Sequence, residues 1–98
     1  MSLKQRMKME IKYTTKFRKQ YHKATKEIKR AFAQTLDLFL EDPHHPVLRN
    51  HTLKREYSGH RSIDITADWR AIFVIEKNRK GEEKILFKFI GTHKMLYE

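Results

Sequence analysis

The spacing of the apolar residues changes halfway along this chain, and that change restricts the fold more than any other feature. Between residues 28 and 40, apolar side chains recur three or four positions apart, as on one face of a helix. After Gly59 they alternate with polar residues, as in Ile63 and Ile65, or form a short apolar run over 71–75. Both later patterns are typical of strands. Helices followed by strands favour an α+β domain.

Threonines and a proline mark the ends of the predicted helices. Thr14 or Thr15 can cap a first helix, and Thr25 can cap a second helix or mark a bend. The second helix should end at Asp42-Pro43, because proline disfavours helical backbone at the residue before it. The predicted strands lie at 7–14, 60–67, 71–75 and 85–90, and a polar hairpin loop at 77–83 joins the last two.

These elements predict a single α+β domain over residues 1–98, since a chain of this length has no room for a second core. Two N-terminal helices should pack on one face of a small, mostly antiparallel four-stranded sheet. The opposite face of the sheet is then available for a ligand.

The chain is strongly basic. Its 22 lysines and arginines exceed its 12 acidic residues, which gives a net charge of +10. Such a field attracts polyanions, so nucleic acid is the first candidate partner and an acidic protein the second. The alternative is that the lysines of residues 1–30 only form a solvated helix surface.

Other features exclude whole classes of protein. The sequence contains no cysteine, which excludes a disulfide scaffold and any cysteine-ligated metal site. No apolar run approaches the roughly 20 residues of a membrane helix, and residues 1–12 lack the apolar core of a signal peptide. We therefore expect a cytoplasmic protein that has no membrane partner.

Five polar residues at strand ends or on the polar side of strands could meet on one sheet face. They offer a base, an acid and fixed positive charge, which RNA cleavage without a metal requires. Histidine suits both proton transfers, because its ordinary pKa is about 6.5. These candidates are His51, Asp64, Asp68, Arg70 and His93.

Several of these residues also have a purely structural interpretation. Asp64 could pair with Arg61 or Arg70 across a hairpin, and Trp69 could anchor the core. A zinc site built from His51, His60 and His93 lacks the helical spacing of such sites and is disfavoured. The remaining histidines, which are expected to be solvated, are His22, His44 and His45.

Two stretches of the C-terminal half resemble the YafQ-like branch of the RelE/ParE toxin superfamily. Residues 51–73 contain a His-x-Leu segment, a Gly-x-Arg strand start and an Asp-Trp turn. Residues 89–97 contain Gly-Thr-His followed by Met-Leu-Tyr. The resemblance implies a RelE-like fold and a toxin that cuts mRNA, usually on the ribosome, with neither a metal nor a cofactor. The implied partners are a cognate antitoxin, mRNA and the ribosome.

The same resemblance implies roles for individual residues. Asp68 would accept a proton, and His93 would protonate the leaving group. His51 would be a second base or an orienting group, and Tyr97, at a position usually held by phenylalanine, would stack on a base. Arg70 departs from the YafQ-like branch, which is apolar there, and matches instead the phosphate-binding arginine of other RelE relatives. The residues expected to contact RNA are Lys54, Arg61, Asp64, Trp69 and Lys88.

Two positions depart from the family pattern. Asp64 stands where histidine is common, and Phe89 stands where an arginine is common. A lost cation can lower the rate by orders of magnitude, although Arg70 on an adjacent strand could restore the charge. The alternative is a non-catalytic relative, either a gyrase inhibitor of the ParE type or a basic module that only binds nucleic acid.

Overall fold

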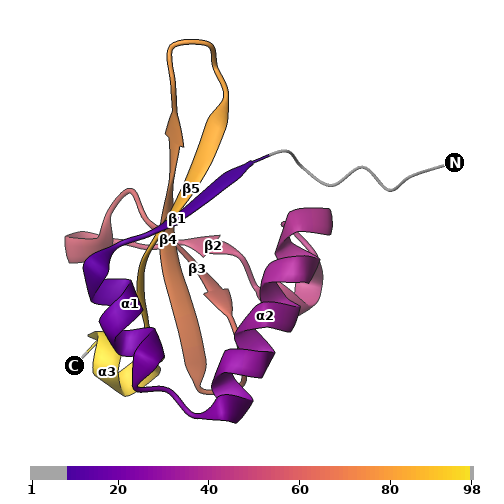
Figure 1. Ribbon diagram of the computed structural model, residues 1–98. Coiled ribbons are helices and arrows are strands. Elements are labelled where there is room, and N and C mark those ends of the chain that lie inside the picture. Colours follow the sequence, from indigo (N-terminus) through magenta and orange to yellow (C-terminus); the bar gives the residue numbers. More distant parts are fainter. Residues whose placement is uncertain (1–8, 98) are drawn as a thin grey trace, which may run out of the picture.

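A five-stranded sheet forms the centre of the molecule in a computed structural model, which describes residues 9–97. The strand order is β1-β5-β4-β3-β2, with β1 parallel to β5 and every other pair antiparallel (Figure 1). The strands are β1 (Glu10–Tyr13), β2 (His51–Thr52), β3 (Arg61–Asp64), β4 (Trp69–Lys77) and β5 (Glu83–Thr92).

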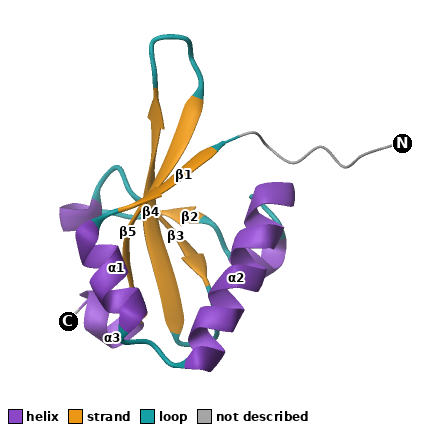
Figure 2. Ribbon diagram, in the orientation of Figure 1, coloured by secondary structure: helices purple, strands orange, loops and turns teal. Residues whose placement is uncertain are grey.

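Two helices lie across one face of this sheet (Figure 2). Helix α1 (Thr15–His22) begins where the hydroxyl of Thr14 accepts a hydrogen bond from the amide of Phe17, at 3.0 Å. Helix α2 (Lys26–Glu41) is capped in the same way by Thr25. It ends at Asp42, before Pro43, as the sequence predicts.

The main core is aromatic and lies between the helices and the sheet. Phe17, Phe32 and Phe39 of the helices pack against Phe73 and Phe87 of the strands, and all five side chains are buried. The ring of Phe87 lies 5.7 Å from that of Phe17 and 5.4 Å from that of Phe32. Burial of these large side chains stabilises the fold by about 1.5–3 kcal/mol for each ring.

The fold class is confirmed, but the prediction of four strands is wrong by one. The additional strand, β2, has only two residues, so it shows no measurable alternation. A short helix, α3 (His93–Tyr97), was also not predicted, and Gly91 lies within β5. The start of the first predicted strand, residues 7 and 8, lies outside the described residues.

Strands β4 and β5 are longer than predicted at both ends, and their outer ends form a polar hairpin that projects from the body of the molecule (Figure 1). The hairpin is held by ion pairs between Lys84 and Glu76 and between Lys77 and Glu83. A polar, solvated ladder has no apolar pattern, so the sequence rules detect only its buried part.

The pairing of β4 with β5 shifts by one residue between Ile72 and Phe73. Ile72 pairs with Phe89 while Phe73 pairs with Phe87, which leaves Lys88 as an extra residue. Such a bulge reverses the side on which the following residues point. Phe87 therefore faces the helices, and Phe89 faces the opposite side of the sheet.

Candidate functional site

The face of the sheet opposite α1 and α2, called here the open face, carries most of the candidate residues. Directly paired residues on neighbouring strands point to the same side. His51 pairs with Ser62, and Asp64 pairs with Arg70. Because Ile63 between them lies in the main core, all four point to the open face.

Helix α3 packs on the open face and brings two further candidates to it. The amide of His93 donates a hydrogen bond to the carbonyl of Asp68, at 3.0 Å, and the hydroxyl of Tyr57 donates one to the carbonyl of Leu96, at 2.8 Å. The side chain of Leu96 is buried. The helix can approach closely because Gly91, the open-face partner of Arg70, has no side chain.

Asp68 and His93 are thus joined through their backbones at one end of the sheet. The turn before β4 is fixed by the hydroxyl of Thr66, which accepts hydrogen bonds from the amides of Asp68 and Trp69. The side chains of Asp68 and His93 are both exposed, and the ring of His93 lies 4.7 Å from that of Tyr97. A carboxylate, an imidazole and an aromatic ring are therefore accessible to a ligand here.

Arg70 is held tightly beside this group. Its Nε lies 3.0 Å from Oδ1 of Asp64, and only 14% of its side chain is exposed. Its Nη1 donates hydrogen bonds to the carbonyls of Thr66, Ala67 and Trp69, at 3.1 Å each. Asp64 therefore pairs with Arg70, as the structural interpretation predicted, and not with Arg61. Its Nη1 hydrogen atoms are thus shared among three backbone carbonyls of the turn before β4.

His51 lies at the edge of the open face, on the short strand β2. Its Nδ1 lies 2.7 Å from the carbonyl of Arg49, which can only accept, so Nδ1 carries the proton in this contact. The exposed ring then presents Nε2 either as a proton acceptor or, when charged, as a donor. This arrangement fits both of the roles that the sequence suggested for His51.

Aromatic side chains cover the part of the open face next to α3. The ring of Tyr57 lies 5.6 Å from that of Phe89 and 5.6 Å from that of Tyr97, and His60 stacks on Phe89. Burial raises the pKa of Tyr57 above 10.0, and the neighbouring Tyr97 and Glu56 add to that rise. The phenol of Tyr57 is therefore neutral near pH 7 and serves as a hydrogen-bond donor.

A groove of about 560 Å³ runs beside these rings. Its walls combine the aromatic and basic side chains of Lys54, Arg55, Tyr57 and Tyr97 with one acidic side chain, that of Glu56. Such a combination suits the backbone and bases of a single-stranded nucleic acid.

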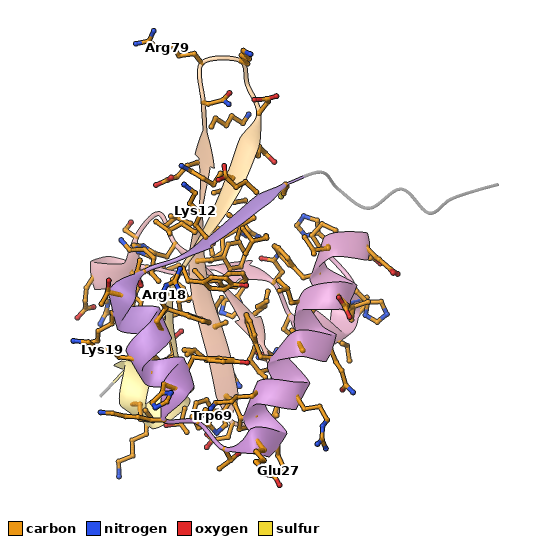
Figure 3. The ribbon with its side chains drawn as sticks, in the orientation of Figure 1. Lys12, Arg18, Lys19, Glu27, Trp69 and Arg79 are labelled. Carbon is orange, nitrogen blue, oxygen red and sulfur yellow. The ribbon has the colours of Figure 1, made fainter. Side chains whose placement is uncertain are left out.

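The structure does not bring every predicted RNA-contact residue to this face. Arg61 points to the helix side, where its Nε donates a hydrogen bond to Asn50 at 2.7 Å. Trp69 packs against the main core, at the end of the sheet nearest the connection between α1 and α2 (Figure 3). Lys88 is half-buried in the bulge, and its carbonyl accepts a hydrogen bond from Thr14. Lys54, in the groove, and Asp64 do lie on the open face.

The histidines outside the site have varied surroundings. His45 was expected to be solvated, but its Nδ1 accepts a hydrogen bond from the amide of Val47 and so caps a 3-10 turn over Pro46–Leu48. His22 and His44 are exposed. Among residues 9–97, no three histidine or acidic side chains gather as metal ligands, so the zinc alternative finds no geometric support. No helix in this described range is long and apolar enough to cross a bilayer.

Three residues of this face were missed by the sequence reasoning. Arg49 lies beside Asp64, while Arg55 and Tyr57 line the groove. An aromatic residue within the polar segment 54–60 was a usable signal for Tyr57. The two arginines gave none, because the sequence has 22 basic residues that look alike.

Comparison with known proteins gives one family and a set of related structures. The model of the family described as the bacterial toxin of type II toxin–antitoxin system, YafQ, matches residues 9–98. The crystal structure of YafQ from E. coli strain BL21(DE3) is 21% identical and has a TM-score of 0.75, over 93% of this chain and 100% of that chain. A comparison with curated protein sequences gives no match.

Two further structures have the same fold. The E. coli DinJ-YafQ toxin–antitoxin complex is 20% identical with a TM-score of 0.72, over 92% of this chain and 98% of that chain. The YoeB/ParE toxin from Agrobacterium tumefaciens is 16% identical with a TM-score of 0.69, over 87% of this chain and 99% of that chain. At these identities the likeness supports the fold alone.

Proposed function

This chain belongs to the YafQ family of bacterial type II toxin–antitoxin toxins, and from that premise we propose that it is an endoribonuclease that cleaves mRNA on its open face. The observation that carries the proposal is the hydrogen bond between the backbones of His93 and Asp68, at 3.0 Å. It holds an exposed carboxylate and an exposed imidazole at one end of the sheet, next to the fixed positive charge of Arg70.

Asp68 and His93 can supply both proton transfers of RNA cleavage. Asp68 takes the proton of a 2′-hydroxyl, whose oxygen then forms a bond to the adjacent phosphorus. The bond from phosphorus to the 5′ oxygen breaks, and His93 gives its proton to that oxygen. The products are a 2′,3′-cyclic phosphate and a 5′-hydroxyl, so the protein side chains supply the acid and base without a metal.

The position of His51 supports an orienting role for this residue. Strands lie about 4.8 Å apart, so β2 is about 14 Å from β5 across the open face. At that separation His51 is better placed to contact the RNA backbone than to share a proton with His93. Its proton on Nδ1 is fixed by the carbonyl of Arg49, which keeps the ring in one orientation.

RNA binding would use stacking together with charge. Tyr97 tilts against His93 and borders the groove that contains Lys54, so a base stacked on Tyr97 lies beside a cation. The net charge of +10 attracts the RNA, and the same charge suits an acidic antitoxin. We propose a cognate antitoxin and the ribosome as partners in the cytoplasm, and the DinJ-YafQ complex is a structural relative in which toxin and antitoxin are joined.

The proposal is tested by expression in bacteria and by cleavage with the purified protein. Expression should arrest growth and produce cut transcripts, and cleavage in vitro should continue when EDTA is present. His93→Gln or Asp68→Asn should lower the rate by about 100-fold to 10,000-fold. His44→Gln is the matched control, because His44 is exposed and lies outside the site. Intact transcripts in cells that contain the folded wild-type protein would reject the proposal.

One observation favours a second candidate, a non-catalytic toxin. Phe89 places an aromatic ring against Tyr57 and His60 on the open face, where a cation would otherwise face the phosphate. A protein of this kind would bind nucleic acid or inhibit gyrase without cutting RNA. Inhibition of supercoiling by purified protein, together with toxicity that His93→Gln does not change, would support this second candidate.

A further inference from the structure

Two arginines have a backbone conformation that arginine normally avoids. Arg49 has φ of 47° and Arg55 has φ of 59°, and they are the two non-glycine residues with positive φ in the described part of the chain. Left-handed backbone is unfavourable for residues with a Cβ, and such strain is concentrated at functional sites. The two arginines precede and follow β2, so they bracket His51.

The neighbours of Arg49 fix its backbone and leave its side chain available. Leu48 is buried, the amide of Arg49 donates to the carbonyl of Pro46 at 3.1 Å, and its own carbonyl contacts His51. Its Nε lies 3.6 Å from Oδ2 of Asp64, yet 69% of its side chain is exposed. The strained backbone thus directs an accessible guanidinium from the sheet edge onto the open face.

Asp64 lies between two guanidinium groups, Arg49 at 3.6 Å and Arg70 at 3.0 Å. One carboxylate cannot neutralise both, so the trio has a net positive charge. Arg70 is mostly buried, and its Nη1 donates to three carbonyls. The exposed member of the trio, which an RNA phosphate can reach, is Arg49.

Arg55 is placed at the other end of β2, in the wall of the aromatic groove. Its carbonyl accepts a hydrogen bond from the amide of Ser58, at 2.9 Å, which fixes the turn that carries Tyr57. Its side chain is exposed, and within residues 9–97 its guanidinium forms neither a hydrogen bond nor an ion pair. An unpaired guanidinium next to Tyr97 is positioned for a phosphate beside a stacked base.

We propose that Arg49 and Arg55 are the phosphate ligands of this nuclease. Arg49 binds the phosphate that is cleaved and supplies the charge stabilisation that Phe89 cannot. Arg55 binds a neighbouring phosphate of the strand whose base stacks on Tyr97. The inference rests on the RNA cleavage proposed above, but the binding part of its test does not require cleavage.

The kinetic test compares Arg49→Gln, Arg55→Gln and the control Arg30→Gln, which removes the same charge from an exposed position of α2. Arg49→Gln should lower kcat about 100-fold or more, as when one donor to a developing anion is removed. Arg55→Gln should raise KM and leave kcat unchanged, and Arg30→Gln should change neither. Wild-type kcat in Arg49→Gln would overturn the assignment of Arg49.

Glycine variants separate function from folding. Arg49→Gly and Arg55→Gly relieve the positive φ, so their thermal midpoints should not fall below that of wild type by more than a few degrees. Their loss of activity should nevertheless equal that of the glutamine variants. Full activity in the glycine variants would show that the arginine side chains bind no phosphate.

The binding test uses a 2′-O-methyl RNA, which has no nucleophile and cannot be cut. Its affinity should fall with salt, and each variant that loses one phosphate contact should reduce the slope of log affinity against log salt by about 0.7. Arg30→Gln should keep the wild-type slope. Unchanged slopes in Arg49→Gln and Arg55→Gln would refute the inference, whereas reduced slopes in a protein that cuts no RNA would refute only the nuclease proposal.

Discussion

A single methyl group at Gly91 should damage the open face and spare the main core. In Gly91→Ala, the new Cβ would lie 3.3 Å from Cβ of Met95 and 3.4 Å from Cγ and Cδ2 of Leu96. Carbon atoms pack best at about 3.5–4.0 Å. Helix α3 must therefore move away from the sheet by a few tenths of an ångström or undock from it.

The size of the effect follows from what holds α3 in place. The side chain of Leu96 is 7% exposed, and burying a leucine contributes about 1.5–3 kcal/mol. The hydrogen bond from Tyr57 to the carbonyl of Leu96 adds about 1 kcal/mol. Overpacking typically costs about 1–3 kcal/mol, so we expect the free energy of unfolding to fall by about that amount.

The loss of activity should be larger than the loss of stability implies. Helix α3 carries both His93 and Tyr97, and a displacement of about 1 Å in a catalytic group can lower a rate about 100-fold. The cleavage rate should therefore drop by up to about that factor, depending on how far α3 moves, at a temperature where the variant is still fully folded. Unfolding followed by circular dichroism and single-turnover cleavage measure the two effects separately.

Gly81→Ala is the matched control. Gly81 lies at the hairpin tip with φ of 82°, and a Cβ there has no neighbour within 4 Å. Alanine in left-handed backbone costs about 1–2 kcal/mol, so the control should lose similar stability and keep its cleavage rate. If the two variants lose equal stability and both keep the wild-type rate, the positioning of the site by α3 is refuted.

Three other substitutions test separate parts of the site. Arg70→Met should lower the free energy of unfolding by about 3 kcal/mol. This is the lower end of the range for a broken buried ion pair, because Arg49 remains near Asp64. Urea unfolding of Arg70→Met with and without Asp64→Leu should show that the second substitution restores most of the lost stability. Burial raises the pKa of Tyr57 in the folded state, so the tyrosine ionises first in the unfolded state and stability falls as pH rises above about 10. Tyr57→Phe should make that fall shallower when the free energy of unfolding is measured between about pH 9 and pH 11. An equally steep fall in Tyr57→Phe would contradict the burial of Tyr57. Phe89→Arg, which adds a cation to the open face besides Arg49, should increase the cleavage rate, and no increase in a folded variant would contradict the placement of position 89 beside the cleaved phosphate.

The sequence rules succeed where a local pattern decides the structure. The helices have a clear period and threonines at their starts, and of the alternatives that the sequence left open the structure has Thr14 as the first cap and Thr25 as the second. The apolar run at 71–75 identified β4, because its first three residues, Ala71, Ile72 and Phe73, are buried on both faces of the sheet and leave no polar position. These signals act within a few residues and do not depend on the rest of the fold.

The sequence rules fail where a contact between residues far apart in the sequence determines the local structure. Strand β2 exists only because β3 lies beside it, and α3 forms where Gly91 allows it to pack on the sheet. The bulge at Lys88 is also invisible in the sequence, since simple alternation would put Phe87 and Phe89 on the same side. That bulge decides that Phe89 belongs to the open face and not to the core.

The sequence indicated which residues are candidates for the site better than it indicated how those residues are arranged. The resemblance picked out Asp68, Arg70 and His93, and pairing across the strands and with α3 places them at one end of the sheet. It could not show that Arg70 is engaged by Asp64, because the partner of a basic residue depends on strand register. The backbone strain at Arg49 and Arg55 is likewise a property of the folded chain alone.

Mass spectrometry of RNA fragments tests most directly whether the open face cleaves RNA by internal attack. Purified wild-type protein should yield 3′ fragments that begin with a 5′-hydroxyl and 5′ fragments that end in a 2′,3′-cyclic phosphate, and His93→Gln should yield almost none. Fragments that carry a 5′-phosphate, or equal amounts of fragments from wild type and His93→Gln, would contradict the assignment of Asp68 and His93.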